Sequence, residues 1–192
     1  MLLEKLLKGA NFSINIFNLE ESKLFDQYFE RILISKDTLL IKEGEIERYS
    51  YFVFDGILRC WLLNHKGEEQ IFCFCKEGTF SMSNISFTLQ TKSAFNVQTI
   101  VDSVIYRIDK KQENELYTAI PKVKTVFEDL NAILLNKLLK RNIDLIKYSP
   151  EQYYLQMIEE YGITLNYIPL KDIASYLGIT PQALSRIRKR IF

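Results

Sequence analysis

The feature that most limits the fold of this chain is a change in the spacing of its apolar residues near residue 111. Before that point, residues 31–110 form short runs rich in β-branched and aromatic residues, separated by glycine turns. After it, apolar residues recur at every third or fourth position, which is the period of a helix. Strands followed by helices indicate an α+β fold in which an antiparallel β-roll precedes a helical part.

Glycines mark the turns of the predicted roll. Asp-Gly at 55–56 separates two β-rich runs, 49–55 and 57–64, and this dipeptide between two strands is a strong hairpin signal. His-Lys-Gly at 65–67 predicts a second turn before the strand 69–76. We therefore expect the first two runs to form a hairpin, with another turn directly after it.

The composition sets the class of protein. The chain has 192 residues, of which 47% are hydrophobic and 26% charged, and its net charge is +1. This balance is ordinary for a soluble globular protein, and no run approaches the ~18 apolar residues of a membrane span. Three cysteines without a framework spacing indicate a reducing compartment. We expect a cytoplasmic protein with no membrane partner.

Residues 112–148 predict a long helix with two apolar faces, and Pro121 suits its first turn. The first face carries Val123, Phe127, Leu130, Leu134 and Leu138, and the second carries Leu135, Leu139, Ile143 and Ile146. One domain rarely surrounds so long a rod, so we expect one face on the roll and the other on a second copy of the helix. We assign the first face to the dimer contact. The alternative is a helix buried on all sides within a monomer.

Near the C-terminus, two short helices joined by a tight turn are predicted. Leu170–Tyr176 forms the first, and Gly178 after it tolerates the left-handed turn conformation. Thr180 is placed to cap the second helix, and Pro181 suits its first position. The small Ala174 lets the two helices approach near the bend. This spacing is typical of a helix-turn-helix.

The second of these helices has an apolar face and a polar one. Leu184 and Ile187 point inward, whereas the other face offers amide, hydroxyl and guanidinium groups, which read base edges in a major groove. The candidate base-reading residues are Gln182, Ser185 and Arg186, and the candidate phosphate ligands are Thr180, Arg188, Lys189 and Arg190. A solvated basic helix face is the alternative. Because the charge coincides with the turn framework, DNA binding is the preferred interpretation.

With these segments identified, the chain resembles the Crp/Fnr superfamily of bacterial transcription regulators. The matching stretches are LIKEGE from Leu40, YFVFDGILRCW from Tyr51, EGTF from Glu77, KSAFNVQTI from Lys92 and IASYLGITPQALSRIRKRI from Ile173. The resemblance implies a cyclic-nucleotide-binding-like roll in 1–111, a dimerisation helix in 112–148 and a helix-turn-helix domain in 149–192. It also implies a homodimer on palindromic double-stranded DNA, an effector held in the roll, and RNA polymerase as a further partner.

The nucleotide site that the resemblance implies is incomplete. Met82 and Ser83 replace the family's Gly-Glu pair, whose Glu binds a ribose hydroxyl, and Lys92 and Ser93 stand for the Arg-Ser pair that binds the cyclic phosphate. Lysine lacks the bidentate fork of arginine. We therefore expect no cyclic AMP cofactor, and either a different small effector or none. The candidate pocket residues are Phe80, Met82, Ser83, Asn84, Lys92 and Ser93.

Other cofactors and enzymatic sites also lack their residues. No cysteine cluster near the N-terminus suits an iron–sulfur centre, and Cys73 and Cys75 alternate with phenylalanines in one strand, as small core residues do. His65, the single histidine, lies in a turn, so the histidine-rich metal sites of β-roll enzymes are excluded. Nucleophile elbows and phosphate-binding glycine loops are missing too. We expect no metal and no enzymatic activity.

The sequence ends at Phe192, where members of the superfamily generally continue into a β-hairpin wing. We therefore expect phosphate contacts from Lys147, Lys171 and the terminal arginines, with a modest salt dependence. The alternative function is a ligand-sensing or protein-interaction roll that does not bind DNA. Retention on DNA at graded salt concentrations distinguishes the two.

Overall fold

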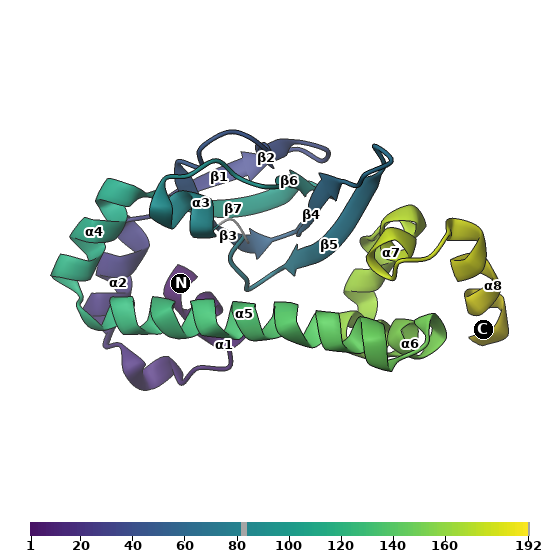
Figure 1. Ribbon diagram of the computed structural model, residues 1–192. Helices are drawn as coiled ribbons and strands as arrows, with labels where there is room; N and C mark the ends of the chain where they lie inside the picture. Colours follow the sequence, from purple (N-terminus) through teal and green to yellow (C-terminus); the bar gives the residue numbers. More distant parts are fainter. Residues whose placement is uncertain (82–83, 192) are drawn as a thin grey trace.

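The structure is a computed structural model that describes residues 1–81 and 84–191. It places a β-roll against a long helix, with a group of short helices beyond the far end of the roll (Figure 1). Nowhere in those two ranges is there a helix with both the length and the apolar character needed to cross a bilayer.

The described strands of the roll form two antiparallel sheets, as the sequence predicts. Their bounds are β1 Glu30–Ile34, β2 Leu39–Ile41, β3 Tyr49–Asp55, β4 Ile57–Leu63, β5 Glu69–Lys76, β6 Asn96–Thr99 and β7 Ser103–Asp109. The strand orders are β1-β7-β3 and β2-β6-β4-β5, so β5 is an edge strand. The apolar core between the sheets and α5 includes Val53, Leu58 and Ile105. The α+β class is confirmed.

Asp55-Gly56 is not the hairpin turn that we predicted. β3 pairs with β7, whereas β4 pairs with β5 and β6, so the chain passes from one sheet to the other at this dipeptide. Only Gly56 has a positive φ, 113°, whereas a type I′ hairpin needs positive φ at both positions. A Cβ on Gly56 would lie 2.2 Å from Ser103 Oγ. The glycine therefore serves a crowded corner. By contrast, the turn at 65–67 does join the paired strands β4 and β5.

The two helices predicted near the C-terminus begin at the expected residues, whereas the long helix predicted over 112–148 is divided in two. The described helices are α1 Leu2–Gly9, α2 Leu19–Gln27, α3 Asn84–Leu89, α4 Lys110–Ala119, α5 Lys122–Lys147, α6 Pro150–Tyr161, α7 Leu170–Tyr176 and α8 Pro181–Ile191, with short 3₁₀ turns η1 Ile14–Ile16 and η2 Gly162–Tyr167. The segment 112–148 holds parts of two helices, because Ile120-Pro121 separates α4 from α5. Ser149 caps α6 with its side chain, which starts a new direction after α5.

The first apolar face of α5 packs on the chain itself, which corrects its assignment to a dimer contact. Val123 and Phe127 are buried with residues of α1 and α2, Leu130 packs beside them, and Leu134 and Leu138 lie against the core of the roll. The second face is the free one. Its exposed fractions are 68% for Leu135, 56% for Leu139, 50% for Ile143 and 88% for Ile146.

Candidate nucleic-acid interface

α7 and α8 pack against each other across a turn that the sequence specifies closely. Gly178 has a φ of 70°, and the amide of Ile179 donates to the carbonyl of Ala174 at 3.0 Å. Ala174 is fully buried, so its small side chain allows the close approach. The hydroxyl of Thr180 accepts from the amide of Ala183 at 3.2 Å, which is the predicted cap.

The inner face of α8 is anchored in a shared apolar core. Leu184 and Ile187 are buried together with Ile173 and Leu177 of the α7 segment. These contacts fix the rotation of α8 about its axis, and they leave the polar residues on the opposite side.

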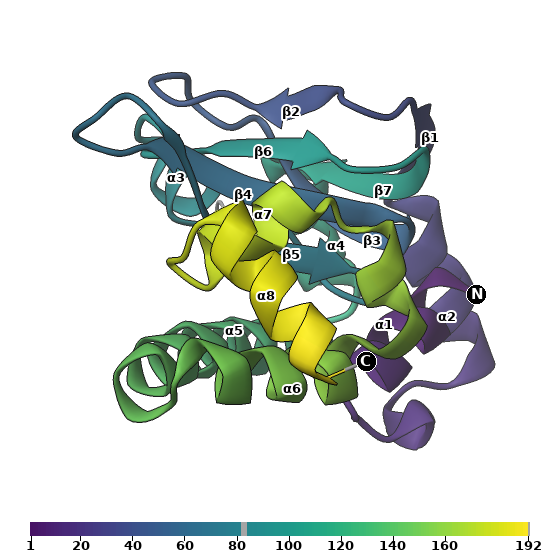
Figure 2. The same cartoon turned by 90° about the vertical axis from the view of Figure 1, so that its right-hand side faces the viewer.

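The outer face of α8 presents the predicted base-reading and phosphate-binding residues to solvent. Thr180, Gln182, Ser185, Arg186, Lys189 and Arg190 are exposed, and Arg188 is half-buried. Arg186, Arg188 and Lys189 have no ion pair with any residue of 1–81 or 84–191. Figure 2 shows α8 in front of the other elements when the molecule is viewed from this end. The two further lysines expected to contact phosphates are exposed as well. Lys171 lies at the start of α7 and Lys147 at the end of α5.

Arg190 differs from its neighbours because it is paired within the chain. Its guanidinium forms an ion pair with the carboxylate of Glu151 on α6. Both side chains are well exposed, so this pair contributes little to stability. A phosphate contact by Arg190 requires that the pair opens.

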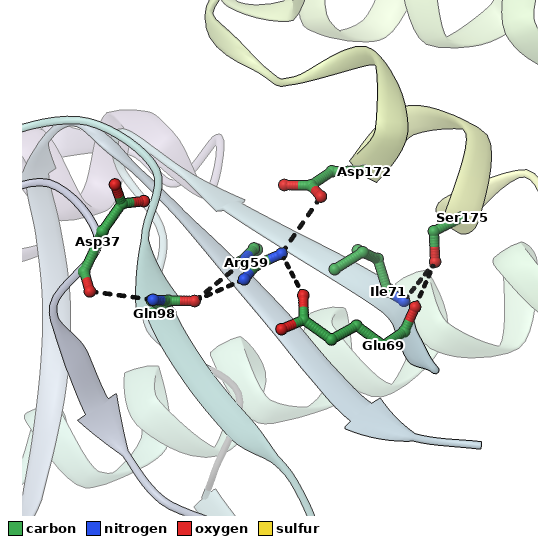
Figure 3. Close-up of polar contacts among 7 residues, drawn as sticks. All are labelled: Asp37, Arg59, Glu69, Ile71, Gln98, Asp172 and Ser175. Atoms are coloured by element: carbon green, nitrogen blue, oxygen red, sulfur yellow. Dashed lines mark hydrogen bonds and ion pairs between the residues drawn. The ribbon is translucent and has the colours of Figure 1, made fainter. Parts of the chain in front are cut away.

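α7 is docked on the free edge of β5, as Figure 3 shows. The hydroxyl of Ser175 accepts from the amide of Ile71 at 2.9 Å and donates to the carbonyl of Glu69 at 3.2 Å. Gln70 donates from its side chain to the carbonyl of Ser175. On the other side, Arg141 of α5 donates to the carbonyl of Tyr176 at 2.9 Å. Hydrogen bonds from both the roll and α5 therefore hold the first helix of the pair.

An ion network with a buried Arg59–Asp172 pair lies beside this contact. Arg59 of β4 reaches Asp172 of α7 at 3.2 Å and Glu69 of β5 at 2.8 Å. It also donates to the side chain of Gln98 at 2.7 and 3.0 Å (Figure 3). Burial raises the pKa of Asp172, and the charge of Arg59 acts against this rise. Arg59 is thus the strongest of the neighbouring charges that favour the ionised form of Asp172.

The residues predicted for an effector pocket do not come together. Phe80 lines a cavity of about 620 Å³ between the roll, α4 and α5. Lys92, in contrast, is exposed beside Ile46, and Ser93 is buried, with its hydroxyl donating to the carbonyl of Phe95 at 2.8 Å. Neither lines the cavity. Met82 and Ser83 lie outside the described residues, and Asn84 begins α3.

Comparisons with known proteins agree with this geometry. Residues 31–119 match the family model of the cyclic nucleotide-binding domain. Among solved structures, the chain is similar to FixK2 from Bradyrhizobium japonicum, with 18% identity, coverage of 85% of this chain and 84% of that one, and a TM-score of 0.72. The c-di-GMP-responsive global regulator CLP of Xanthomonas campestris has 12% identity, 91% coverage of both chains and a TM-score of 0.70.

A third structure carries the family name itself. It is a protein from Eubacterium rectale described as a transcriptional regulator of the crp/fnr family, with 16% identity, coverage of 92% of this chain and 84% of that one, and a TM-score of 0.67. The chain has the Crp/Fnr fold. No curated protein sequence matches it significantly. The resemblance read from the sequence motifs is thus confirmed at the level of the fold.

Within the Crp/Fnr fold, the cavity residues that sequence reasoning missed come from α4 and α5. Lys110, Glu113 and Tyr117 of α4 and Lys124 and Asn131 of α5 line the same space as Phe80. Their signal in the sequence is the polar face of residues 110–118, most of which falls in the long helix predicted to begin at residue 112. The break at Ile120-Pro121 turns α4 against the roll and creates the cavity wall.

Proposed function

We propose that the protein is a sequence-specific, DNA-binding transcription regulator of the Crp/Fnr type. The observation that carries the proposal is the outer face of α8, where Gln182, Ser185 and Arg186 are exposed while Leu184 and Ile187 are buried. Side chains of these types at the N-terminal half of a second helix read bases in a major groove. Lys189 and Arg188 supply charge for the neighbouring phosphates.

The protein acts as a homodimer on a palindromic site. The support is the exposed face of α5, whose four apolar residues recur at three- and four-residue steps over about three turns. Such a face is self-complementary about a two-fold axis, because each helix offers the same ridge to the other. A dimer of this kind places two α8 helices about one DNA turn apart, ~34 Å.

Any effector is a small molecule other than cyclic AMP. The position that should carry the phosphate-binding arginine holds Lys92, which is exposed and does not line the cavity. The cavity beside Phe80 is instead lined by amines and carboxylates of α4 and α5. The similar protein CLP is described as responsive to c-di-GMP, so ligands other than cyclic AMP occur on this fold.

The test is selection of binding sites from random DNA, followed by mobility-shift titrations of variants. Arg186→Ala should relax the preference at one base position per half-site and weaken specific binding by about 1–3 kcal/mol. Lys189→Ala should weaken binding to all sequences alike and reduce the salt slope by about one. Arg48→Ala is the matched control, because it removes an exposed arginine from the roll and should leave the selected sequence unchanged.

Two outcomes would count against this function. An unchanged base preference in Arg186→Ala would remove the assigned reading role from α8. If the wild-type protein showed no salt-dependent retention on any DNA, the terminal helices would be a protein-contact module and the roll the active part.

A further inference from the structure

All three cysteines of the chain converge at one place in the roll. Cys60 of β4 lies opposite Cys73 of β5 in the strand register, and Cys75 is two residues further on the same face of β5. The three sulfur atoms lie within 4.8 Å of one another, and those of Cys60 and Cys75 are 3.8 Å apart. The alternation in β5 predicts only that Cys73 and Cys75 are core residues, and no local pattern brings Cys60 beside them.

The spacing of the sulfurs matches that of a three-coordinate metal ion. A metal–thiolate bond is about 2.3 Å long, so three sulfurs around one ion in a plane are about 4 Å apart. The cysteines reach that arrangement with shifts of roughly 1 Å or less, which side-chain rotation supplies. We propose that Cys60, Cys73 and Cys75 form a three-thiolate site for a soft, low-coordinate metal ion such as Cu(I).

The set of donor atoms favours Cu(I) over the common alternatives. Thiolates select soft ions, of which Cu(I) and zinc are the usual ones. Zinc in protein sites takes four ligands, and the cluster found in residues 1–81 and 84–191 offers three sulfurs with no carboxylate or imidazole. His65 is exposed in the turn at the tip of the same strands and is not part of the cluster.

The residues around the three cysteines suit a negatively charged metal–thiolate site, and they leave a path by which the ion can reach it. Cys60 and Cys75 are buried, whereas Cys73 is partly accessible. Cys73 and Cys75 border a cavity of about 80 Å³ whose wall also includes Lys137 and Arg141 of α5. On binding, each thiol releases its proton to solvent, and three thiolates with one Cu(I) carry a net charge of −2. The two cations offset this charge.

The cysteines are concentrated at one place in a core that is otherwise built from ordinary apolar residues. Leu58, Val97 and Ile105 fill the neighbouring core with ordinary apolar side chains. The chain has three cysteines, and all three sulfur atoms lie at this one place.

The test is a titration of the reduced, full-length protein with Cu(I) under anaerobic conditions against a chromogenic Cu(I) chelator. One Cu(I) per chain should bind, with a new thiolate-to-copper absorption band. Copper-edge X-ray absorption should show three sulfur neighbours at about 2.3 Å. Zn(II), titrated in parallel, should bind more weakly. This measurement does not involve DNA, so its result is independent of the proposed function.

Single-residue variants distinguish a site that needs all three sulfurs from copper binding by fewer of them. Cys73→Ala should lower Cu(I) affinity roughly tenfold or more, and because Cys73 is partly exposed this variant should keep the fold, as far-UV circular dichroism would verify. Cys60→Ala and Cys75→Ala should do the same. His65→Ala is the control and should bind like the wild type. Full affinity in any single cysteine variant, or a wild-type protein that does not compete with the chelator, would overturn the proposal.

Discussion

The guanidinium of Arg59 and the carboxylate of Asp172, 113 residues apart in the chain, lie 3.2 Å from each other. Their side chains are 11% and 6% exposed. The pair joins the roll to the helix that supports α8, so the orientation of the proposed reading face is set by residues of the roll. A disturbance on β4 or β5 therefore reaches α7 directly through side chains rather than along the chain.

Replacing Arg59 with alanine should loosen this junction. Asp172 would be left buried beside Glu69 without a cation, and such a loss typically costs about 3 kcal/mol. Urea unfolding at neutral pH should measure the loss. Trp61, the only tryptophan, packs against the same apolar core as α7 and α8, so its fluorescence should change as well. The loss should shrink at low pH, where Asp172 can take up a proton.

Arg107→Ala is the matched control for that experiment. Arg107 pairs with Glu30 at 2.7 Å, but the side chains are 28% and 55% exposed, and exposed pairs contribute less than about 1 kcal/mol. Equal losses of unfolding free energy in the two variants would show that the buried Arg59–Asp172 pair stabilises the fold no more than an exposed pair does.

The exposed face of α5 should be required for dimerisation. Leu139→Glu puts a charge at the middle of this face, where a two-fold contact would bury it against its own copy. Sedimentation should then report a monomer, with little change in the thermal stability of the fold. Leu33→Glu changes an even more exposed leucine on β1 and should leave the dimer intact. A wild-type monomer at micromolar concentration would contradict this prediction.

Gly56 should tolerate no side chain, because a Cβ would meet both strain and a clash. Its φ is 113° and Ser103 Oγ lies 2.2 Å from the Cβ position, whereas Gly67 has a φ of 76° with nothing within 4 Å. Gly56→Ala should cost more than about 2 kcal/mol, and Gly67→Ala about 1 kcal/mol. Chemical denaturation of the two variants compares them directly. Similar losses would mean that the sheet-to-sheet corner adjusts freely.

Glu47 should make the fold less stable as pH rises from about 4.5 to 7. Burial raises its pKa from 4.5 to about 7, against hydrogen bonds from the amides of Tyr49 and Arg48 and the side chain of Tyr51. The folded state therefore keeps a proton that the unfolded state loses, so stability is highest below pH 4.5 and levels off above 7. The difference is on the order of 3 kcal/mol.

Glu47→Gln should abolish this part of the pH dependence, because the amide keeps the shape and does not titrate. The measurement is the free energy of unfolding in urea at pH 5 and pH 8. Glu45→Gln, whose side chain is exposed, should retain the wild-type profile. If the pH profile of Glu47→Gln matched the wild type, other groups would be responsible for the slope.

The helix pair at the C-terminus could be predicted almost residue by residue, because its signals are local. Gly178, Thr180 and Pro181 each act within one turn of the backbone, and the structure places each in the expected conformation. The apolar and polar faces of α8 follow from the helical period alone. For this part of the molecule the sequence was sufficient to name the exposed residues.

Long-range choices could not be predicted in the same way. Asp55-Gly56 specifies a turn but not whether β3 and β4 pair, since that depends on which sheet buries each strand. Two similar apolar stripes on α5 do not reveal which one the roll covers. The meeting of Cys60 with Cys73 requires the register of β4 against β5, which no local pattern contains.

The hydroxyl of Ser175 also has a consequence for solubility. β5 ends its sheet, and the Ser175 hydroxyl accepts from the backbone amide of Ile71 on the open side of that strand. An uncovered edge strand is a template on which another chain can add a strand. Any state in which the terminal helices swing away from the roll therefore bares a surface prone to aggregation. Such a state avoids aggregation only if another segment or partner covers the strand. α7 therefore protects the edge of β5 and also supports α8.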